Sequence, residues 1–440
     1  MTDLLNHMLF ALVDFRHLIE GQFATRALWE WILFFMPVFI FGEFPRYIFP
    51  AVFLLGAKVA DRLPHDDREK KTFFATAPSV SVLLVGYNEE ASVANAIRSL
   101  LELDYPNLEI IVIDDNSEDR MYEEARPFAD RGQVKLYRNS AATGRSGRPT
   151  ASNMALYLSS GDYIVSVDAD TSFDRDMLFH MIGPFYDPKV GAVAGNIKVR
   201  NLGTSVWTRL QAVEYALSIT IWKQWLGLLG MGMQVSGAFG AFRREALLSF
   251  GAWDPELAED ADLTLKIKKV GWKIVFAPAA IAMTNAPETW RVLRGQRFRW
   301  DKGGFRTYFR KHADILKFWQ YDWRNAFEIS LEFFFTVFLT FVYALYLVLM
   351  LWFYPRLLIF VWCLAYLIYV GVTLFCFAIA LVFSERKAQE VTLIPTVFLF
   401  PGYKALFRWV RFGALMLEFF RINYQEGYLP ESAWRNTKKW

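Results

Sequence analysis

The chain is poor in charged residues and in cysteine for its length. Charged residues make up 21% of the 440 residues, below the value of about a quarter that is usual in soluble proteins. Two cysteines exclude a disulfide scaffold, and a net charge of +3 is too small to indicate a nucleic acid as partner. Apolar side chains are abundant instead, at 54%, and exclude a disordered chain. The composition therefore predicts a membrane protein that carries a substantial soluble domain.

Two common nucleotide-binding motifs are also missing. No glycine-rich dinucleotide fingerprint follows the first predicted strand, and no Walker sequence occurs in the chain. These absences argue against an NAD-dependent enzyme and against a P-loop ATPase. The two cysteines, Cys363 and Cys376, lie in an apolar run and indicate a reducing compartment or simple core filling.

The apolar residues are concentrated at the two ends of the chain. Residues 332–352 and 357–383 are each long enough to cross a bilayer, which takes about 20 helical residues. Residues 28–42 and 47–57 form a shorter apolar pair. Residues 391–420 carry prolines and cations, and are typical of a kinked span that continues into an interfacial helix, or of a re-entrant element. We expect four or five membrane crossings.

The charges near these segments predict the orientation of the protein. The first 26 residues lack a small-residue cleavage site, so we expect the first span to be retained. Lys58 and Arg62 follow the N-terminal apolar pair, and residues 291–311 are strongly basic. The positive-inside rule then places the central domain in the cytoplasm, beneath a multi-pass inner or plasma membrane.

The central residues alternate between predicted strands and predicted helices. Apolar runs at 80–85, 109–113 and 163–167 are typical of buried strands, and residues 89–101 and 151–159 have helical character. Such alternation predicts a mostly parallel sheet that is covered on both faces. Parallel sheets bind ligands at the carboxyl ends of their strands, and polar residues follow each of these runs.

Asp168 and Asp170 directly follow one of these predicted strands. Two closely spaced carboxylates suit a hard cation, such as Mg²⁺, that also takes phosphate oxygens and waters as ligands. The alternative is a helix N-cap, because Asp170 begins a polar turn before a predicted helix. The residues alone leave both interpretations open.

Glu259, Asp260 and Asp262 form a second acidic cluster, just before an amphipathic run. Any of the three carboxylates could cap that helix. One of them could equally accept a proton from an incoming hydroxyl group, which requires a base within hydrogen-bond reach.

Residues 291–310 are rich in arginine and aromatic side chains. This pattern is typical of an amphipathic helix that lies on anionic lipid. Gln296, Arg299 and Trp300 fall within it, and side chains of these types could clamp a diphosphate and stack against a sugar ring.

Six motifs, taken together and in order, resemble those of the membrane-embedded processive family-2 glycosyltransferases. These are Tyr87-Asn-Glu-Glu90, Asp114-Asp-Asn-Ser117, Asp168-Ala-Asp170, Ser236-Gly237-Ala238, Glu259-Asp260 and Gln296-Arg-Phe-Arg-Trp300. The family includes cellulose, hyaluronan and poly-N-acetylglucosamine synthases, and Pro287-Glu-Thr289 is most similar to the last of these. The resemblance implies an α/β fold of the GT-A type, with a Rossmann-like mixed and mostly parallel sheet. It also implies an α-helical transmembrane region with interfacial amphipathic helices.

The resemblance further divides the chain into five parts. Residues 1–72 would hold the N-terminal membrane segments, and residues 73–285 would form the cytoplasmic catalytic domain. Interfacial helices with the Gln296–Trp300 motif would occupy residues 286–325. C-terminal transmembrane helices would follow over 326–420, and a cytoplasmic tail over 421–440.

Individual roles are carried over to the matching positions only. The resemblance places Asp260 as the general base with Glu259 beside it, and Trp300 under the terminal acceptor sugar, near Ser236 and Gly237. It assigns Mg²⁺ or Mn²⁺ to Asp170 and Asp168. The residues implied to contact the nucleotide of a UDP-sugar are Tyr87, Glu89, Asp114, Asp115, Arg148, Asp168, Gln296 and Arg299. Arg148 stands where the family often has lysine, and Asn116 stands where glycine is commoner.

The function implied is the inverting, metal-dependent transfer of a sugar from a UDP-sugar to the non-reducing end of a growing β-linked polysaccharide, coupled to membrane translocation. One alternative is a nonprocessive transferase that adds one or a few sugars to a membrane lipid. The other is a noncatalytic membrane scaffold with a transferase-like domain. The expected partners are the donor, the oligosaccharide or polysaccharide acceptor and membrane lipid, with no nucleic acid. A small membrane subunit or a homo-oligomer is also compatible with so few spans.

Overall fold

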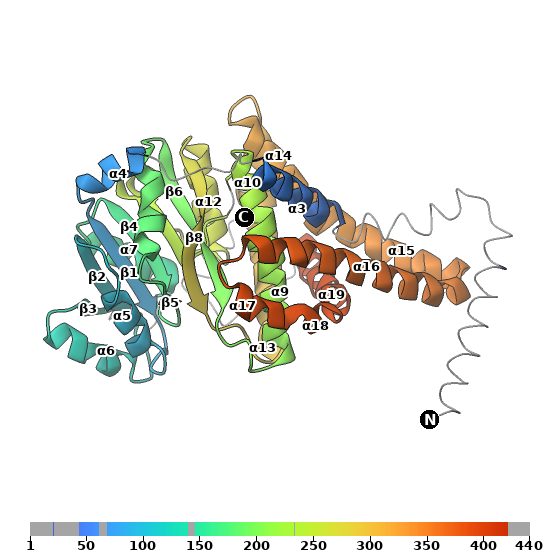
Figure 1. The fold of residues 1–440 in the computed structure, drawn as a ribbon, viewed down its shortest axis with the longest axis horizontal. Helices are drawn as coiled ribbons and strands as arrows, with labels where there is room; N and C mark the ends of the chain where they lie inside the picture. The colour runs from blue at the N-terminus through green and yellow to red at the C-terminus, as the bar shows by residue number, and fades with distance from the viewer. Residues whose placement is uncertain (1–20, 22–43, 61–67, 140–145, 233, 421–440) are drawn as a thin grey trace.

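The computed structural model describes Gly21 and residues 44–60, 68–139, 146–232 and 234–420. Figure 1 shows a sheet-containing part at one end of the molecule, and a long helical pair, α15 and α16, that projects away from it at the other end. The expected segments at 28–42 and 421–440 lie outside the described residues.

The sheet has eight strands in the order β3-β2-β1-β4-β7-β6-β8-β5. Their bounds are β1 Val80–Gly86, β2 Leu108–Asp114, β3 Lys135–Arg138, β4 Tyr163–Asp168, β5 Ser172–Phe173, β6 Val190–Val199, β7 Phe239–Arg243 and β8 Lys273–Thr284. The first four neighbours in this order pair in parallel, β7 is antiparallel to both β4 and β6, and β6 pairs in parallel with β8. The predicted mixed sheet is therefore present.

The apolar runs form strands because both faces of the sheet are covered. In β1, Val82 and Leu84 contribute to the core on one face, whereas Leu83 and Val85 contribute to the core on the other. Successive side chains of a strand point to opposite faces, so a strand buried on both sides must be continuously apolar.

Short helices cover the two faces of the sheet. Side chains of α5 (Val93–Leu101), α6 (Met121–Asp130) and α8 (Met177–Ile182) pack on one face. Side chains of α7 (Arg148–Leu158), α11 (Arg244–Leu248) and α12 (Glu259–Lys269) pack on the other. The remaining helices of this part are α4 (Arg68–Ala75) and the 3₁₀ turn η1 (Gly183–Tyr186).

A separate apolar core joins the helices outside the sheet. It contains α3 (Phe44–Val59) and one continuous helical stretch made of α9 (Val206–Tyr215), the π-helix η2 (Ala216–Lys223) and α10 (Gln224–Leu228). The other elements of the helical part are α13 (Trp290–Arg306), η3 (Thr307–Lys311), η4 (Ala313–Leu316), α14 (Trp323–Glu332), η5 (Phe333–Phe338), α15 (Leu339–Phe353), α16 (Pro355–Phe383), α17 (Lys387–Glu390), η6 (Val391–Leu393), α18 (Ile394–Val397) and α19 (Phe400–Phe419).

Two of the described helices are long and apolar enough to cross a membrane, Trp323–Phe353 and Leu357–Phe383. They correspond to the two strongest predicted spans. Residues 391–420 form η6, α18 and α19 in succession, and Pro395 and Pro401 each stand at the second position of a new helical segment. That they form a kinked span or a re-entrant element stays a prediction. The expected four or five crossings stay a prediction.

Candidate active site

The ends of β1, β2 and β4 bring three of the sequence motifs to one edge of the sheet. Gly86 at the end of β1 pairs with Asp114, and Val85 pairs with Asp168. Tyr87 and Glu89 follow β1 at this edge, and the Tyr87 hydroxyl donates a hydrogen bond to Glu118 Oε1 over 3.5 Å. Burial raises the pKa of Glu89, and the nearby charge of Asp170 adds to the effect.

The two aspartates after β2 organise the surrounding loops. Asp114 is fully buried and accepts hydrogen bonds from the Ser117 backbone over 2.9 Å and from Arg138 Nε over 2.6 Å. Asp115 is 1% exposed and accepts from Asn139, Ser146 and Gly147. Both carboxylates therefore fix the loops that would surround a nucleotide, in addition to any contact with it.

Asn116 has a φ angle of +59°. This left-handed conformation is favoured by glycine and tolerated by asparagine. The departure from the family's commoner glycine at this position thus keeps the same turn.

Asp168 and Asp170 leave the end of β4 as two half-buried carboxylates. Asp170 accepts hydrogen bonds from the hydroxyl groups of Thr171 over 3.0 Å and Thr284 over 3.4 Å. Among the described residues, no three His, Cys, Asp or Glu side chains converge to hold a metal alone, so a cation here would need substrate oxygens or waters as well. This donor set fits Mg²⁺ or Mn²⁺, which commonly bind through one or two carboxylates and phosphate oxygens.

Arg148 connects this edge of the sheet to the second acidic cluster. Its guanidinium forms an ion pair with Asp168, donates to the Gly237 carbonyl and lies 3.7 Å from Glu259 Oε1. The arginine thus links the strand end, the Ser236–Ala238 segment and the start of α12. The family's commoner lysine could not make all of these contacts, because it lacks a planar fork of donors.

Glu259 and Asp260 are the first two residues of α12. Ala258 holds the N-cap position, and no side chain caps the helix there, so neither carboxylate serves as the N-cap. Asp260 Oδ1 accepts a hydrogen bond from the Ala261 backbone over 2.8 Å. Burial, together with the charge of Asp260, raises the pKa of Glu259 to about 7.

Asp262 has a structural environment. It is fully buried and forms ion pairs with Lys266, Lys311 and His312. These contacts tie α12 to the end of η3 and to His312, which follows it.

Gln296, Arg299 and Trp300 lie on α13. The Gln296 side-chain oxygen is buried and has no hydrogen-bond partner among the described residues, an arrangement that leaves the amide available for a ligand. The Trp300 side chain is 41% exposed, although the indole contacts Arg297.

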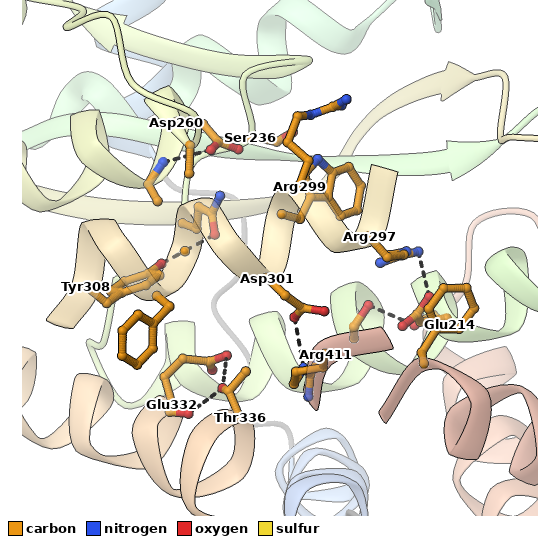
Figure 2. Close-up of a pocket in the computed structure, with 18 of the residues that line it drawn as sticks. Glu214, Ser236, Asp260, Arg297, Arg299, Asp301, Tyr308, Glu332, Thr336 and Arg411 are labelled. Carbon is orange, nitrogen blue, oxygen red and sulfur yellow. Dashed lines mark hydrogen bonds and ion pairs between the residues drawn. The ribbon is translucent and has the colours of Figure 1, made fainter. Parts of the chain in front are cut away.

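One cavity of about 420 Å³ brings residues of these motifs together (Figure 2). The motif residues that line it are Ser236, Glu259, Asp260, Arg297, Arg299 and Trp300, whereas Gln296 is not among its lining residues. Asp168 and Asp170 are not among its lining residues, but Arg148 joins Asp168 to Glu259. The strand end and the cavity are therefore adjacent.

The cavity also extends to residues that the sequence did not single out as site residues. Arg46 of α3 lines it and lies 3.4 Å from Glu332, at the start of the long apolar helix. Glu332 thus faces a polar cavity. Lys223 lines the cavity too, and burial lowers its pKa to about 8. In the sequence, the only signal for these three charged residues is their position beside or within apolar runs.

The sequence of this chain is similar to a known family and to several named relatives. Residues 77–303 match the model of the family described as "Glycosyltransferase like family 2". A poly-beta-1,6-N-acetyl-D-glucosamine synthase of Staphylococcus epidermidis is 34% identical over 240 residues, which cover 54% of this chain and 57% of the relative. The probable glycosyltransferase YdaM of Bacillus subtilis is 33% identical over 274 residues, or 60% and 63% of the two chains. The matched region thus spans less than two thirds of either relative.

A solved structure extends the likeness in fold. The mannosyltransferase PcManGT from Pyrobaculum calidifontis, in complex with GDP-Man and Mn²⁺, has a TM-score of 0.57 and 19% sequence identity. The likeness covers 89% of this chain and 100% of that structure, and it shows a common GT-A-like fold. With a family model that matches more than half of its residues, the chain belongs to glycosyltransferase family 2 and is a glycosyltransferase.

Proposed function

We propose that the protein transfers a sugar from a UDP-sugar to the non-reducing end of a growing β-linked polysaccharide, with inversion at the anomeric carbon. The observation that carries this proposal is the shared cavity, in which Asp260, Arg299 and Trp300 lie together and which continues to Glu332 and Thr336 of the apolar helices. A polysaccharide that grows at Asp260 would have a polar path toward the long apolar helices.

The proposed chemistry follows from the charges around the cavity. An acceptor hydroxyl attacks the anomeric carbon, the bond to the UDP diphosphate breaks, and Asp260 accepts the hydroxyl proton. Arg299 and Gln296 bind the departing diphosphate, and Trp300 stacks against the terminal acceptor sugar. Asp170 and Asp168 would hold Mg²⁺ or Mn²⁺, which supplies positive charge to the diphosphate. One displacement inverts an α-linked donor to a β-linked product, without the glycosyl-enzyme intermediate of retaining hydrolases.

The nucleotide would be bound at the ends of β1 and β2, by Tyr87, Glu89 and the loops that Asp114 and Asp115 organise. The positive charge of Arg148 would balance the negative charges of Asp168 and Glu259. Similarity to a poly-beta-1,6-N-acetyl-D-glucosamine synthase makes UDP-N-acetylglucosamine the first donor to examine.

We further propose that residues 73–285 form a cytoplasmic catalytic domain on a multi-pass membrane protein. The two long apolar helices are consistent with this location, and lipid would cover their exposed side chains.

The proposal is tested with purified protein and radiolabelled UDP-N-acetylglucosamine or UDP-glucose, with Mg²⁺, Mn²⁺ or a chelator. Linkage-specific hydrolases and product sizing then identify the product. We expect one donor to give β-linked chains only when a divalent cation is present. Short glycolipids alone would instead indicate the nonprocessive transferase, and no transfer from any donor would favour a scaffold.

A further inference from the structure

Arg297 lies in the middle of the Gln296–Trp300 motif and has no role in the chemistry proposed above. Its guanidinium carbon lies 4.7 Å from the centre of the Trp300 ring and 5.9 Å from that of Phe407. Its Nη2 atom lies 2.7 Å from Glu214 Oε2, and Figure 2 shows this pair at the side of the cavity away from Asp260. Arg297 thus contacts the indole directly while a carboxylate holds its own position.

Glu214 is in turn held by a second element. The Tyr403 hydroxyl donates to Glu214 Oε2 over 2.7 Å, and Lys404 Nζ lies 3.6 Å from Glu214 Oε1. The carboxylate therefore joins α9, α13 and α19. The side chains of Arg297 and Glu214 are only 16% and 15% exposed, so little water is available to loosen the pair.

We propose that Arg297, fixed by Glu214, is a positioning residue that orients Trp300 for the acceptor sugar. A guanidinium against one face of the indole fixes the tilt of the ring and leaves the opposite face for a sugar. This inference rests on the proposed function, because it takes Trp300 as the acceptor contact. It adds that the acceptor site is built by three elements, including the C-terminal helix α19.

A purely structural role is the competing explanation. A buried ion pair contributes little to stability compared with apolar side chains of similar size, so folding alone does not require this pair beside Trp300. The two explanations differ in which kinetic constant changes. Loss of the Trp300 ring orientation changes the acceptor KM, whereas a general loosening of the fold changes the donor KM and kcat as well.

The experiment uses full-length protein, UDP-N-acetylglucosamine and β-linked N-acetylglucosamine oligosaccharides as acceptors. Arg297→Met removes the positive charge, and Arg297→Lys keeps the charge but lacks the planar guanidinium. Glu214→Gln removes the negative charge that holds Arg297 in place. Arg294→Met is the matched control, because Arg294 is an exposed arginine on the same helix.

We expect Arg297→Met to raise the acceptor KM roughly tenfold and to leave the donor KM within about twofold. Arg297→Lys should fall between this variant and the wild type, Glu214→Gln should act in the same direction, and Arg294→Met should change neither constant. In a Trp300→Ala background, Arg297→Met should have almost no further effect on the acceptor KM, because the group that it orients is gone.

The inference is overturned if Arg297→Met leaves the acceptor KM unchanged, or if its effect is equally large in the Trp300→Ala background. If Arg297→Met does not fold, Arg297→Lys and Glu214→Gln carry the same comparison. Failure of the proposed function has a different signature, since wild-type protein would then transfer no sugar to these acceptors at all.

Discussion

At the scale of single residues, the two carboxylates that begin α12 have different surroundings. Glu259 is buried, and Arg148 lies beside it. Asp260, which lines the same cavity as Glu259, is only half-buried and accepts a hydrogen bond from a backbone amide. Neighbouring carboxylates whose environments differ can take different roles. These surroundings are compatible with the proposed proton transfer to Asp260 and a supporting role for Glu259.

Asp260→Asn should abolish most sugar transfer while UDP binding is retained. The amide cannot take the hydroxyl proton, and the loss of a general base lowers the rate by roughly 10²–10⁴-fold. Turnover with labelled donor and UDP affinity by calorimetry check this, with Asp176→Asn, at an exposed position, as the control. A variant that keeps wild-type turnover would remove Asp260 as the base.

Glu259→Gln should change how stability depends on pH. The pKa of Glu259 is raised from its usual 4.5 to about 7, so between these values the native protein holds a proton that the unfolded chain releases. Stability of the wild type should therefore fall by about 2–3 kcal/mol as pH rises through this window. The glutamine variant lacks this titration.

Thermal unfolding of both proteins between pH 5 and 8 measures the effect. The Tm of the wild type should fall relative to that of Glu259→Gln as pH rises. Glu245→Gln, at an exposed position, should follow the wild type. Parallel curves for Glu259→Gln and the wild type would show that Glu259 titrates normally.

Some site residues could be predicted from sequence, and others could not. Asp168 ends an apolar strand, and Asp260 lies in the first turn of an amphipathic helix, so the local pattern is enough to single them out. Arg46 meets Glu332 across 286 residues of sequence. No local periodicity reports such a contact, because tertiary packing alone brings α3 to the start of the apolar helix.

At the scale of elements, one carboxylate fastens α19 to α13. Glu418 is 2% exposed and lies close to three cations of the α13 end and η3, with Arg306 at 2.7 Å, Arg310 at 3.0 Å and Lys302 at 3.9 Å. Lys302 is itself fully buried. Since α13 carries Arg299 and Trp300, this contact helps to hold the cavity wall.

Glu418→Gln should destabilise the protein by about 3–5 kcal/mol, because it leaves buried cations without their shared carboxylate. The midpoint of denaturant unfolding measures this change. Glu385→Gln is a suitable control, since Glu385 is exposed in the turn after α16. Equal midpoints for the two variants would show that Glu418 does not fasten α19.

The direction of the later strands was beyond prediction from sequence. Apolar runs indicate burial on both faces, but they do not report which way a strand runs. The antiparallel β7 lies between β4 and β6, and long connections separate it from both in sequence. The helix expected at 89–101 begins only at Val93, after a turn at residues 90–92.

At the scale of the whole molecule, the cavity lies where the sheet part meets the helices. Its lining comes from α12 and α13 as well as from α3, η5 and α19. If α15 and α16 cross a membrane, as we propose, side chains exposed on them are covered by lipid and those on the sheet part by water.

Cysteine labelling tests that arrangement. Cys363 is exposed on α16, whereas Cys376 is buried, and we expect a charged maleimide to leave Cys363 unlabelled in native membranes. Tyr157→Cys, at a position 89% exposed in the sheet part, should be labelled whenever the cytoplasmic side is accessible. Rapid labelling of Cys363 in intact membranes would place α16 in water.

The most direct test of the account is the product itself. Purified protein supplied with an α-linked UDP-sugar and Mg²⁺ or Mn²⁺ should form chains that lengthen with time, and NMR should show that every new linkage is β. Products with α linkages, or free sugar and UDP without chain growth, would contradict a single displacement onto an acceptor held in this cavity.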